Sequence, residues 1–163
     1  MKTVPELKTE RLILRNITEE DTPVIVKLRS DPAVYRFFLS PHPLTEEEHL
    51  KWFRENYSSH PTRFDWMALS NDEEPVGVFG LKKENEEAKT AEISYLLAPG
   101  QTKKGYASEA VKGLIRFARD DWNCETVVAI INEDNTDSVR FIEKLGFEKE
   151  STDGVFATYK RTI

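Results

Sequence analysis

The strongest pattern in the chain is a stripe of apolar residues at helical spacing that begins shortly after Gly105. The stripe consists of Ala107, Ala110, Val111, Leu114, Phe117, Ala118 and Trp122. Residues at this spacing share one face of an amphipathic helix, and that face has to be covered by another layer of the protein. The chain has 163 residues, close to the commonest size for one domain. We therefore expect a single domain, residues 1–163, with its core under this helix.

Three segments before this helix have the length and composition of β-strands. They are Phe64–Leu69, Val76–Leu81 and Ala91–Leu97. Turn-prone or polar sequence separates them, and this arrangement favours an antiparallel meander. After the helix, the short apolar run Val127–Ile131 predicts a strand that is covered on both faces.

The N-terminal part of the chain predicts one strand and two helices. Thr9–Arg15 alternates polar and apolar residues in its second half, which is typical of a strand. A capping box that begins at Thr18 predicts a helix through Leu28, and a second box at Thr45 predicts another helix.

The C-terminal part predicts a further helix and a hairpin. The helix begins at Asn135 or Thr136 and ends near Gly146, which can adopt the left-handed cap conformation. The remaining residues predict a hairpin that turns at Asp153-Gly154. The order of elements indicates an α/β fold with a mixed, mostly antiparallel central sheet and flanking helices.

Composition excludes several classes of function. The net charge of −6 argues against nucleic acid as the main ligand, because phosphate binding needs a basic surface. Apolar runs are too short to cross a bilayer and the first residues lack a signal-peptide stretch, so we expect a cytoplasmic protein without a membrane partner. Cys124 is the one cysteine and stands at the start of an apolar run, which favours a buried thiol over a nucleophile.

The loop between Ala98 and the long helix predicts an anion site. The first N–H groups of a helix lack internal partners and carry the positive end of the helix dipole. Gly105 would let a pyrophosphate approach the backbone, and Lys103 and Lys104 add positive charge. An ordinary lysine-bearing helix start is the alternative, and the spacing matches neither a Walker phosphate loop nor a dinucleotide fingerprint.

Motifs on either side of this loop resemble those of the GNAT superfamily of N-acetyltransferases. They are Ala91-Glu92-Ile93-Ser94-Tyr95-Leu96-Leu97-Ala98-Pro99 before the loop and Asn135-Thr136-Asp137-Ser138-Val139-Arg140-Phe141 after it. The opening Thr9-Glu10-Arg11-Leu12-Ile13-Leu14-Arg15 is similar to the branch that contains ribosomal-protein N-terminal acetyltransferases. The resemblance implies a GNAT fold with a diverging strand pair, and acetyl transfer from acetyl-CoA to a primary amine without a metal.

The resemblance also implies where the cofactor binds. Backbone groups of the strand near its end would hold the pantetheine arm, and the loop with the helix start would hold the pyrophosphate. The implied positions are Leu96, Leu97, Thr102, Lys103, Lys104, Gly105, Tyr106, Ala107 and Asn135. Thr102 replaces the usual Arg or Gln of the phosphate motif, and Lys103 stands where a second glycine is common. Asn135 has a simple helix cap as its alternative role.

Two residues are candidates for acid–base chemistry by the same resemblance. Glu92 is the candidate general base, with a solvated strand glutamate as the alternative. Many members of the superfamily place a tyrosine that acts as general acid where Ile142 stands here. The ribosomal-protein branch also lacks that tyrosine and is thought to use the serine, so the resemblance makes Ser138 the candidate acid. The resemblance implies direct attack of the amine on the thioester, without an acyl-enzyme.

Acceptor residues are indicated more weakly. The resemblance points to Arg29, Phe38, His49 and Trp52 as substrate-binding residues, with Tyr35, Phe37 and Tyr159 as further candidates for the acceptor wall. Many of these aromatic residues have the spacing of core positions. The segment around residues 28–53 is also similar to nucleotide-linked amino-sugar N-acetyltransferases. Three acceptor classes stay open: a nucleotide-linked amino sugar, a protein N-terminus, and a polyamine or other small amine.

The alternatives to this interpretation belong to other classes. Departures at Thr102, Lys103 and Ile142 leave room for a non-catalytic CoA-sensing or protein-interaction module on the same fold. A phosphate-binding domain of a different fold is a third possibility. We expect a monomer or a homodimer.

Overall fold

The computed structural model of the protein describes residues 2–163. The elements in chain order are β1 Leu7–Lys8, β2 Ile13–Asn16, the 3-10 turn η1 Glu19–Asp21, α1 Thr22–Arg29, α2 Pro32–Tyr35, α3 Glu46–Trp52, the π-helical turn η2 Phe53–Tyr57, β3 Arg63–Leu69, β4 Pro75–Lys82, β5 Thr90–Leu97, α4 Tyr106–Asp120, β6 Thr126–Asn132, α5 Thr136–Lys144, β7 Glu148–Asp153 and β8 Phe156–Thr162.

These strands form one mixed sheet in the order β1-β2-β3-β4-β5-β6-β8-β7. Neighbouring strands are antiparallel except β5 and β6, which are parallel. The meander predicted for three consecutive strands is confirmed as β3, β4 and β5. The C-terminal hairpin is confirmed as well, with Gly154 at φ 62° in its turn.

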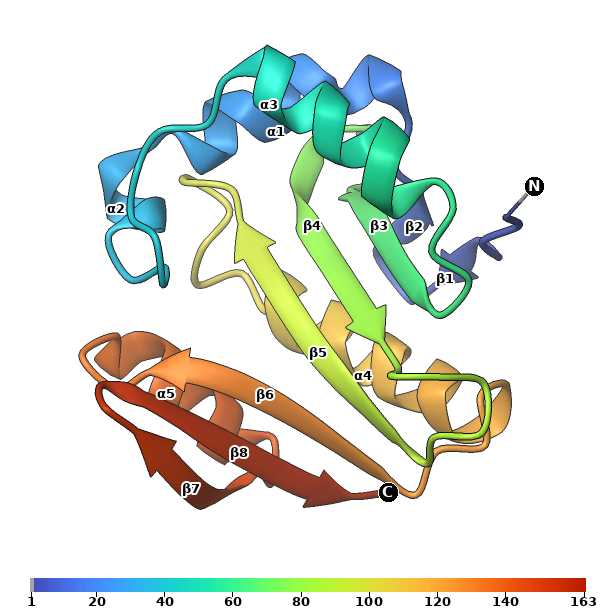
Figure 1. The fold of residues 1–163 in the computed structure, drawn as a ribbon, viewed down its shortest axis with the longest axis vertical. Coiled ribbons are helices and arrows are strands. Elements are labelled where there is room, and N and C mark those ends of the chain that lie inside the picture. Colours follow the sequence, from blue (N-terminus) through green and yellow to red (C-terminus); the bar gives the residue numbers. More distant parts are fainter. Residues whose placement is uncertain (1) are drawn as a thin grey trace.

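The two parallel strands stay together for only three residues each. Thr90–Glu92 of β5 pair with Thr126–Val128 of β6, and beyond this point the strands separate. Figure 1 shows the resulting wedge between β5 and β6, which opens toward the carboxyl ends of both strands. The rest of β5 therefore has backbone groups that no neighbouring strand uses on this side.

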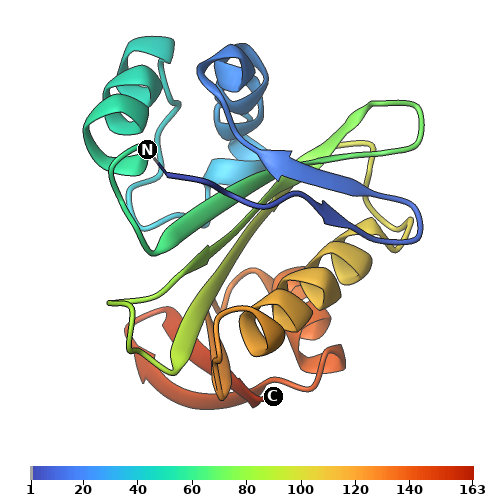
Figure 2. The same ribbon diagram turned by 90° about the vertical axis from the view of Figure 1, so that its right-hand side faces the viewer.

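Helices cover the two faces of the sheet differently. Figures 1 and 2 show α1 and α3 over one face and α4 on the opposite face. The larger core lies under α4 and includes Trp66, Phe79 and Leu114, all fully buried. A smaller core under α1 and η2 contains Ile17, Ile25, Tyr57 and Met67.

Helix α4 corresponds closely to the apolar stripe in the sequence. It begins after Gly105, whose φ of 80° is unfavourable for other residues, and it ends at Asp120. Trp122 was expected on the helix but lies beyond it, because the chain turns through Asn123 at φ 54°. The indole still packs on Phe117, with ring centres 5.5 Å apart.

The strand and the two helices predicted for the N-terminal part are present, but the strand and the first helix have different bounds from the predicted ones. The strand is confined to Ile13–Asn16, because Thr9–Leu12 forms a turn in which the Thr9 N–H donates to the Leu12 carbonyl at 3.0 Å. The capping box at Thr18 exists, but it begins the short turn η1, and α1 follows with Pro23 in its first turn. The box at Thr45 caps α3 as expected.

The prediction that the Val127–Ile131 strand is covered on both faces is wrong. Alternate residues Val127, Ala129 and Ile131 are buried, but Ile130 is 53% exposed. Helix α5 contacts β6, and the Ile130 side chain points to the other face and is left exposed. A continuous apolar run therefore does not prove burial on both faces.

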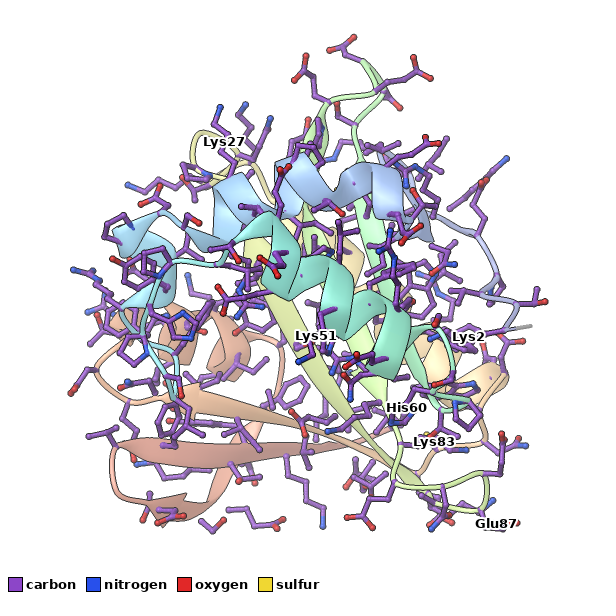
Figure 3. All side chains as sticks on the ribbon, turned by 45° about the horizontal axis from the view of Figure 1, so that its top comes forward. Lys2, Lys27, Lys51, His60, Lys83 and Glu87 are labelled. Carbon is purple, nitrogen blue, oxygen red and sulfur yellow. The ribbon has the colours of Figure 1, made fainter. Side chains whose placement is uncertain are left out.

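The outer faces of the helices are charged. Figure 3 shows Lys27 on α1 and Lys51 on α3, both of which are exposed. Within residues 2–163, no helix combines the length and the apolar character needed to cross a membrane.

Candidate active site

The loop before α4 has the backbone of an anion-binding turn. Lys103 and Gly105 both adopt positive φ, at 62° and 80°, and this turns the chain sharply into the helix. Lys103 and Lys104 are exposed, so their charges are available to a ligand at the helix start. The predicted phosphate motif is thus placed together at the N-terminus of a 15-residue helix.

An ion pair that sequence reasoning missed holds this loop in place. Arg11 donates from Nε to Oε1 of Glu109 at 2.8 Å and from its backbone N–H to Oε2 at 2.7 Å. Thr9 donates a further hydrogen bond to the same carboxylate. Nη1 of Arg11 donates to the Lys104 carbonyl at 2.9 Å, and the guanidinium lies over the Tyr106 ring at 4.6 Å.

The electrostatic effect of this ion pair is visible on Glu109. Burial alone would raise its pKa, but hydrogen bonds from Thr9 and Arg11 hold the pKa below its ordinary value. The carboxylate therefore stays charged and keeps Arg11 beside Gly105 across the ordinary pH range. The Thr9-Glu10-Arg11 sequence between β1 and β2 was the available signal, but the partner of Arg11 lies 98 residues away.

Strand β5 presents the predicted backbone positions at the edge of the wedge. Leu96 and Leu97 pair with Val78 and Gly77 of β4 on one side. On the other side they face the opening between β5 and β6, because the two strands pair only as far as Glu92. The Ala98 N–H donates to Val76 on the β4 side, so the Leu97 backbone groups, which point the opposite way, can bond an extended ligand as an added strand.

The start of α5 lies across the wedge from β5. Asn135 caps the helix, since its Oδ1 accepts the Ser138 N–H at 3.2 Å. The Ser138 hydroxyl oxygen lies 2.6 Å from that of Tyr95, which projects from β5. The two motifs that flank the phosphate loop in sequence therefore meet in space. Tyr95 was not among the predicted site residues.

Glu92 lies at the closed end of the wedge. It pairs with Val128 of β6 and with Lys82 of β4, and it is partly buried. Ser94 is two residues further along the same face of β5 and is exposed. Glu92 is thus on the strand that lines the wedge, on the face away from the α4 core.

The four predicted acceptor residues are close together under α1 and α3. The Arg29 guanidinium lies 4.6 Å from the centre of the Phe38 ring, and the ring centres of His49 and Trp52 are 5.6 Å apart. His49 is only 4% exposed. Within residues 2–163, Nε of Arg29 and Nε2 of His49 are buried and have no hydrogen-bond partner.

The charge state of both groups reflects this environment. Burial lowers the pKa of Arg29, and the charge of Arg63 lowers it further. Burial likewise lowers the pKa of His49, and the charge of Arg29 adds to the shift. His49 is therefore neutral at pH 7, and the region contains a buried Arg29 Nε donor whose hydrogen bond nothing within residues 2–163 accepts.

Asp65 of β3 is a further polar residue that sequence reasoning missed. It is 5% exposed, and Nε of Arg63 donates to its Oδ2 at 3.3 Å. Burial raises the pKa of this carboxyl. A Cβ on Gly80 would collide with Oδ1, so glycine leaves the space that the Asp65 side chain uses. An acid inside the apolar Phe64–Leu69 segment was the available signal.

Other candidates from the sequence lie away from this region or are structural. Tyr159 is only 1% exposed and belongs to the larger core, so the suggestion that it lines an acceptor wall is wrong. Cys124 is buried as expected, and burial raises the pKa of its thiol. Among residues 2–163, no group of three or more His, Cys, Asp or Glu side chains is arranged to hold a metal ion.

Comparisons with known proteins identify this arrangement. Residues 11–148 match the family model described as an acetyltransferase (GNAT) domain. The chain is 30% identical over 160 residues to the uncharacterized N-acetyltransferase p20 of Bacillus licheniformis, a match that covers 95% of this chain and 87% of the relative.

Solved structures share the fold. An acetyltransferase of the GNAT family from Bacillus anthracis has a TM-score of 0.83 and 22% identity, covering 97% of this chain and 98% of that one. A spermidine N-acetyltransferase from Vibrio cholerae, in complex with CoA and spermine, has a TM-score of 0.81 and 16% identity, covering 93% and 94%.

Proposed function

Because the chain belongs to the GNAT family of acetyl-CoA-dependent N-acetyltransferases, we propose that its acceptor is a primary amine on a molecule that also carries an anionic group. Among the three acceptor classes that the sequence leaves open, a nucleotide-linked amino sugar fits this description best. Its phosphates supply the anion and its sugar supplies the amine.

The observation that carries this proposal is the buried Nε donor of Arg29, which has no partner within residues 2–163 and lies near the buried His49. A buried donor without a partner costs about 1–3 kcal/mol, and a ligand oxygen that accepts its hydrogen bond would recover that cost. An arginine binds phosphate or carboxylate through several N–H groups at once. An anionic acceptor would therefore satisfy Arg29 and fix the molecule under α1 and α3.

The same arginine argues against a polyamine. Each end of a polyamine is an ammonium group, and the positive charge of Arg29 would repel it. The Asp65 carboxylate is occupied by Arg63. The spermine-bound structure has only 16% identity to this chain, so it supports the fold and not the acceptor.

We assign the cofactor to the wedge and the loop before α4. The pyrophosphate would meet the N–H groups of the helix start, with Lys103 and Lys104 beside it. The pantetheine arm would lie along the free edge of β5 at Leu96 and Leu97. Asn135 and Ser138 would face the arm from α5.

In the proposed mechanism the amine attacks the thioester carbon directly. The Leu97 N–H stabilises the developing oxyanion, Glu92 takes a proton from the amine through water, and Ser138 assists the departing sulfur. The need for Glu92 depends on the amine. An α-amine of pKa about 7.8 is roughly one-tenth neutral at pH 7, whereas a lysine-like amine of pKa about 10.4 is only about 0.04% neutral.

An acceptor panel tests the proposal. Thiol release from acetyl-CoA is measured with UDP-linked amino sugars, the corresponding free amino sugars, spermidine and a short peptide with a free N-terminus. We expect the largest kcat/KM for an amine on a phosphate-bearing acceptor. Faster turnover of spermidine would contradict the proposed acceptor class, and acetyl-CoA binding without turnover of any amine would favour a non-catalytic module.

Two arginine variants locate the anion subsite. Arg29→Met keeps much of the side-chain shape and removes the charge, so KM for the phosphate-bearing acceptor should rise by about tenfold or more. Arg36→Met is the matched control, because Arg36 also lies over a phenylalanine ring, at 4.5 Å from Phe37, but is exposed. Equal effects of the two changes would contradict the assignment.

A further inference from the structure

The contact between Tyr95 and Ser138 joins the two sides of the wedge. Tyr95 projects from β5 and Ser138 lies in the first turn of α5, with 2.6 Å between their hydroxyl oxygens. Strands β5 and β6 are paired only as far as Glu92 and Val128, so no ladder hydrogen bond crosses the wedge at this level. The two hydroxyls therefore meet beside the place where the proposed mechanism puts the thioester.

Position 142, where many family members have the acid, cannot supply a hydroxyl in this protein. Ile142, one turn after Ser138, is fully buried in the larger core. Its side chain has no hydroxyl and is not exposed to the wedge. A hydroxyl at this end of the site therefore has to come from Ser138 and its neighbour on β5.

Both members of the pair are held in place. The Tyr95 ring packs edge-on against Phe141, with ring centres 5.2 Å apart. The Ser138 backbone is fixed by the N-cap, since its N–H donates to Oδ1 of Asn135. Burial raises the pKa of Tyr95 to about 12, so its phenol keeps its proton at ordinary assay pH.

The direction of the hydrogen bond decides what Ser138 can do. Each hydroxyl has one proton to donate. When Ser138 donates to Tyr95, the serine proton is used within the protein. When Tyr95 donates to Ser138, the serine proton is free to point into the wedge.

We propose that Tyr95 is a positioning residue that donates its hydrogen bond to Ser138 and thereby directs the serine O–H toward the thioester sulfur. This inference rests on the role given to Ser138 in the proposed function. Tyr95 touches neither substrate in this arrangement and acts through Ser138 alone. Tyr95 and Ser138 together thus place a hydroxyl beside the sulfur. Family members with a tyrosine where Ile142 stands here would place one there with a single residue.

The chemical step balances as follows. The amine nitrogen bonds to the acyl carbon, the C–S bond breaks, and its electron pair remains on sulfur. Ser138 stabilises that charge by its hydrogen bond, and the thiolate then takes one proton from solvent. The amine loses one proton to solvent by way of Glu92 and water. Tyr95 and Ser138 end the cycle with the protons they had at the start.

The test is a double-mutant cycle in single-turnover experiments at saturating acetyl-CoA. Ser138→Ala should lower the rate of the chemical step by about a hundredfold or more. Tyr95→Phe keeps the ring and should lower the same rate by a smaller factor, uniformly from pH 6 to 9. The double variant should be no slower than Ser138→Ala, because Tyr95 acts only through the serine. Affinity for acetyl-CoA should change little in all three.

Two further variants show whether a slower rate comes from the Tyr95–Ser138 hydrogen bond or from altered packing of the protein. Tyr159→Phe removes the hydroxyl of another buried tyrosine, which lies on β8, and should leave the rate unchanged. Ser138→Thr keeps a hydroxyl that can accept from Tyr95, so it should retain most of the rate, and adding Tyr95→Phe should lower that rate again. Should Tyr95→Phe alone have no effect, or should its effect multiply with that of Ser138→Ala, the inference is overturned.

The double-mutant cycle does not depend on which amine is the acceptor. The cycle is run with whichever amine the native protein acetylates fastest. If that amine is a polyamine, the proposed acceptor class is wrong while the cycle still tests Tyr95. If Ser138→Ala retains full activity, the proposed role of Ser138 fails, and the inference about Tyr95 fails with it.

Discussion

The loop before α4 and the region under α1 and α3 satisfy their polar groups in opposite ways. Around the loop, Glu109 accepts hydrogen bonds from Thr9 and from two groups of Arg11, and Arg11 also bonds the Lys104 carbonyl. Under α1 and α3, the buried Nε of Arg29 and Nε2 of His49 have no partner within residues 2–163.

This difference separates a preformed site from one that a ligand has to complete. The loop is shaped by protein contacts before any cofactor binds, so binding costs little ordering. The proposed acceptor region instead holds buried nitrogen atoms without hydrogen-bond partners, which lowers the stability of the free protein and raises the gain from a complementary ligand. Preorganisation and ligand completion can therefore be tested separately on the two regions.

The largest expected effect is that of Glu92→Gln on turnover. If Glu92 is the base, kcat/KM should fall by about a hundredfold to ten-thousandfold at low pH and recover partly as pH approaches the pKa of the amine. Glu84→Gln, the same change at an exposed position of the β4–β5 connection, should have no effect. A pH-rate profile checks both. A small effect of Glu92→Gln would favour an amine of low pKa, and wild-type turnover at every pH would remove the assignment.

Gly105→Val should weaken cofactor binding. Valine at φ 80° is strained by about 1–3 kcal/mol, so the loop should relax and binding should lose about fivefold to 150-fold in affinity. Gly154→Val introduces similar strain at φ 62° in the β7–β8 turn, remote from the loop. Calorimetric titration with acetyl-CoA should show the loss only for Gly105. Unchanged affinity in a folded Gly105→Val protein would contradict the placement of the pyrophosphate.

Breaking the ion pair at Arg11 tests whether the loop is preformed. Arg11→Lys keeps the charge but cannot bond both Glu109 and the Lys104 carbonyl in the same geometry, so affinity for CoA should fall about tenfold. Affinity for pantetheine, which lacks the pyrophosphate, should stay the same. Equal loss for both ligands would mean that Arg11 stabilises the whole wedge and not the loop.

Protonation of His49 should weaken the protein below neutral pH. The pKa of His49 is lowered in the folded state, so the unfolded state binds the proton more tightly and stability falls as pH drops below about 6.5. His49→Gln should flatten the dependence of unfolding free energy on pH between 7 and 5.5, as measured by urea titration. An unchanged slope would show that His49 is not held neutral.

Cys124→Ala should have the smallest effect. The thiol is buried and a direct transfer needs no protein nucleophile, so turnover should be unchanged. Loss of one buried atom of this size costs roughly 1 kcal/mol of stability. Detection of an acetylated Cys124 by mass spectrometry during turnover would overturn direct transfer.

Elements with a strong local signal could be predicted from the sequence. Helix α4 follows from its apolar stripe, and the start of α3 follows from the capping box at Thr45. The Val127–Ile131 run was misinterpreted, since a run of apolar residues does not show which face a neighbour covers. The short helix α2 gave no usable periodicity over its four residues.

The sequence by itself determined two local backbone features of this protein, the left-handed turn at Gly105 and the cap at Asn135. Each depends on residues within a few positions of one another, and backbone sterics and capping act at that range. Only the tertiary structure decided that Arg11 bonds Glu109 and that Tyr95 bonds Ser138, because these partners are 98 and 43 residues apart. Burial of Arg29 and His49 without partners was likewise decided by packing, which no local pattern records.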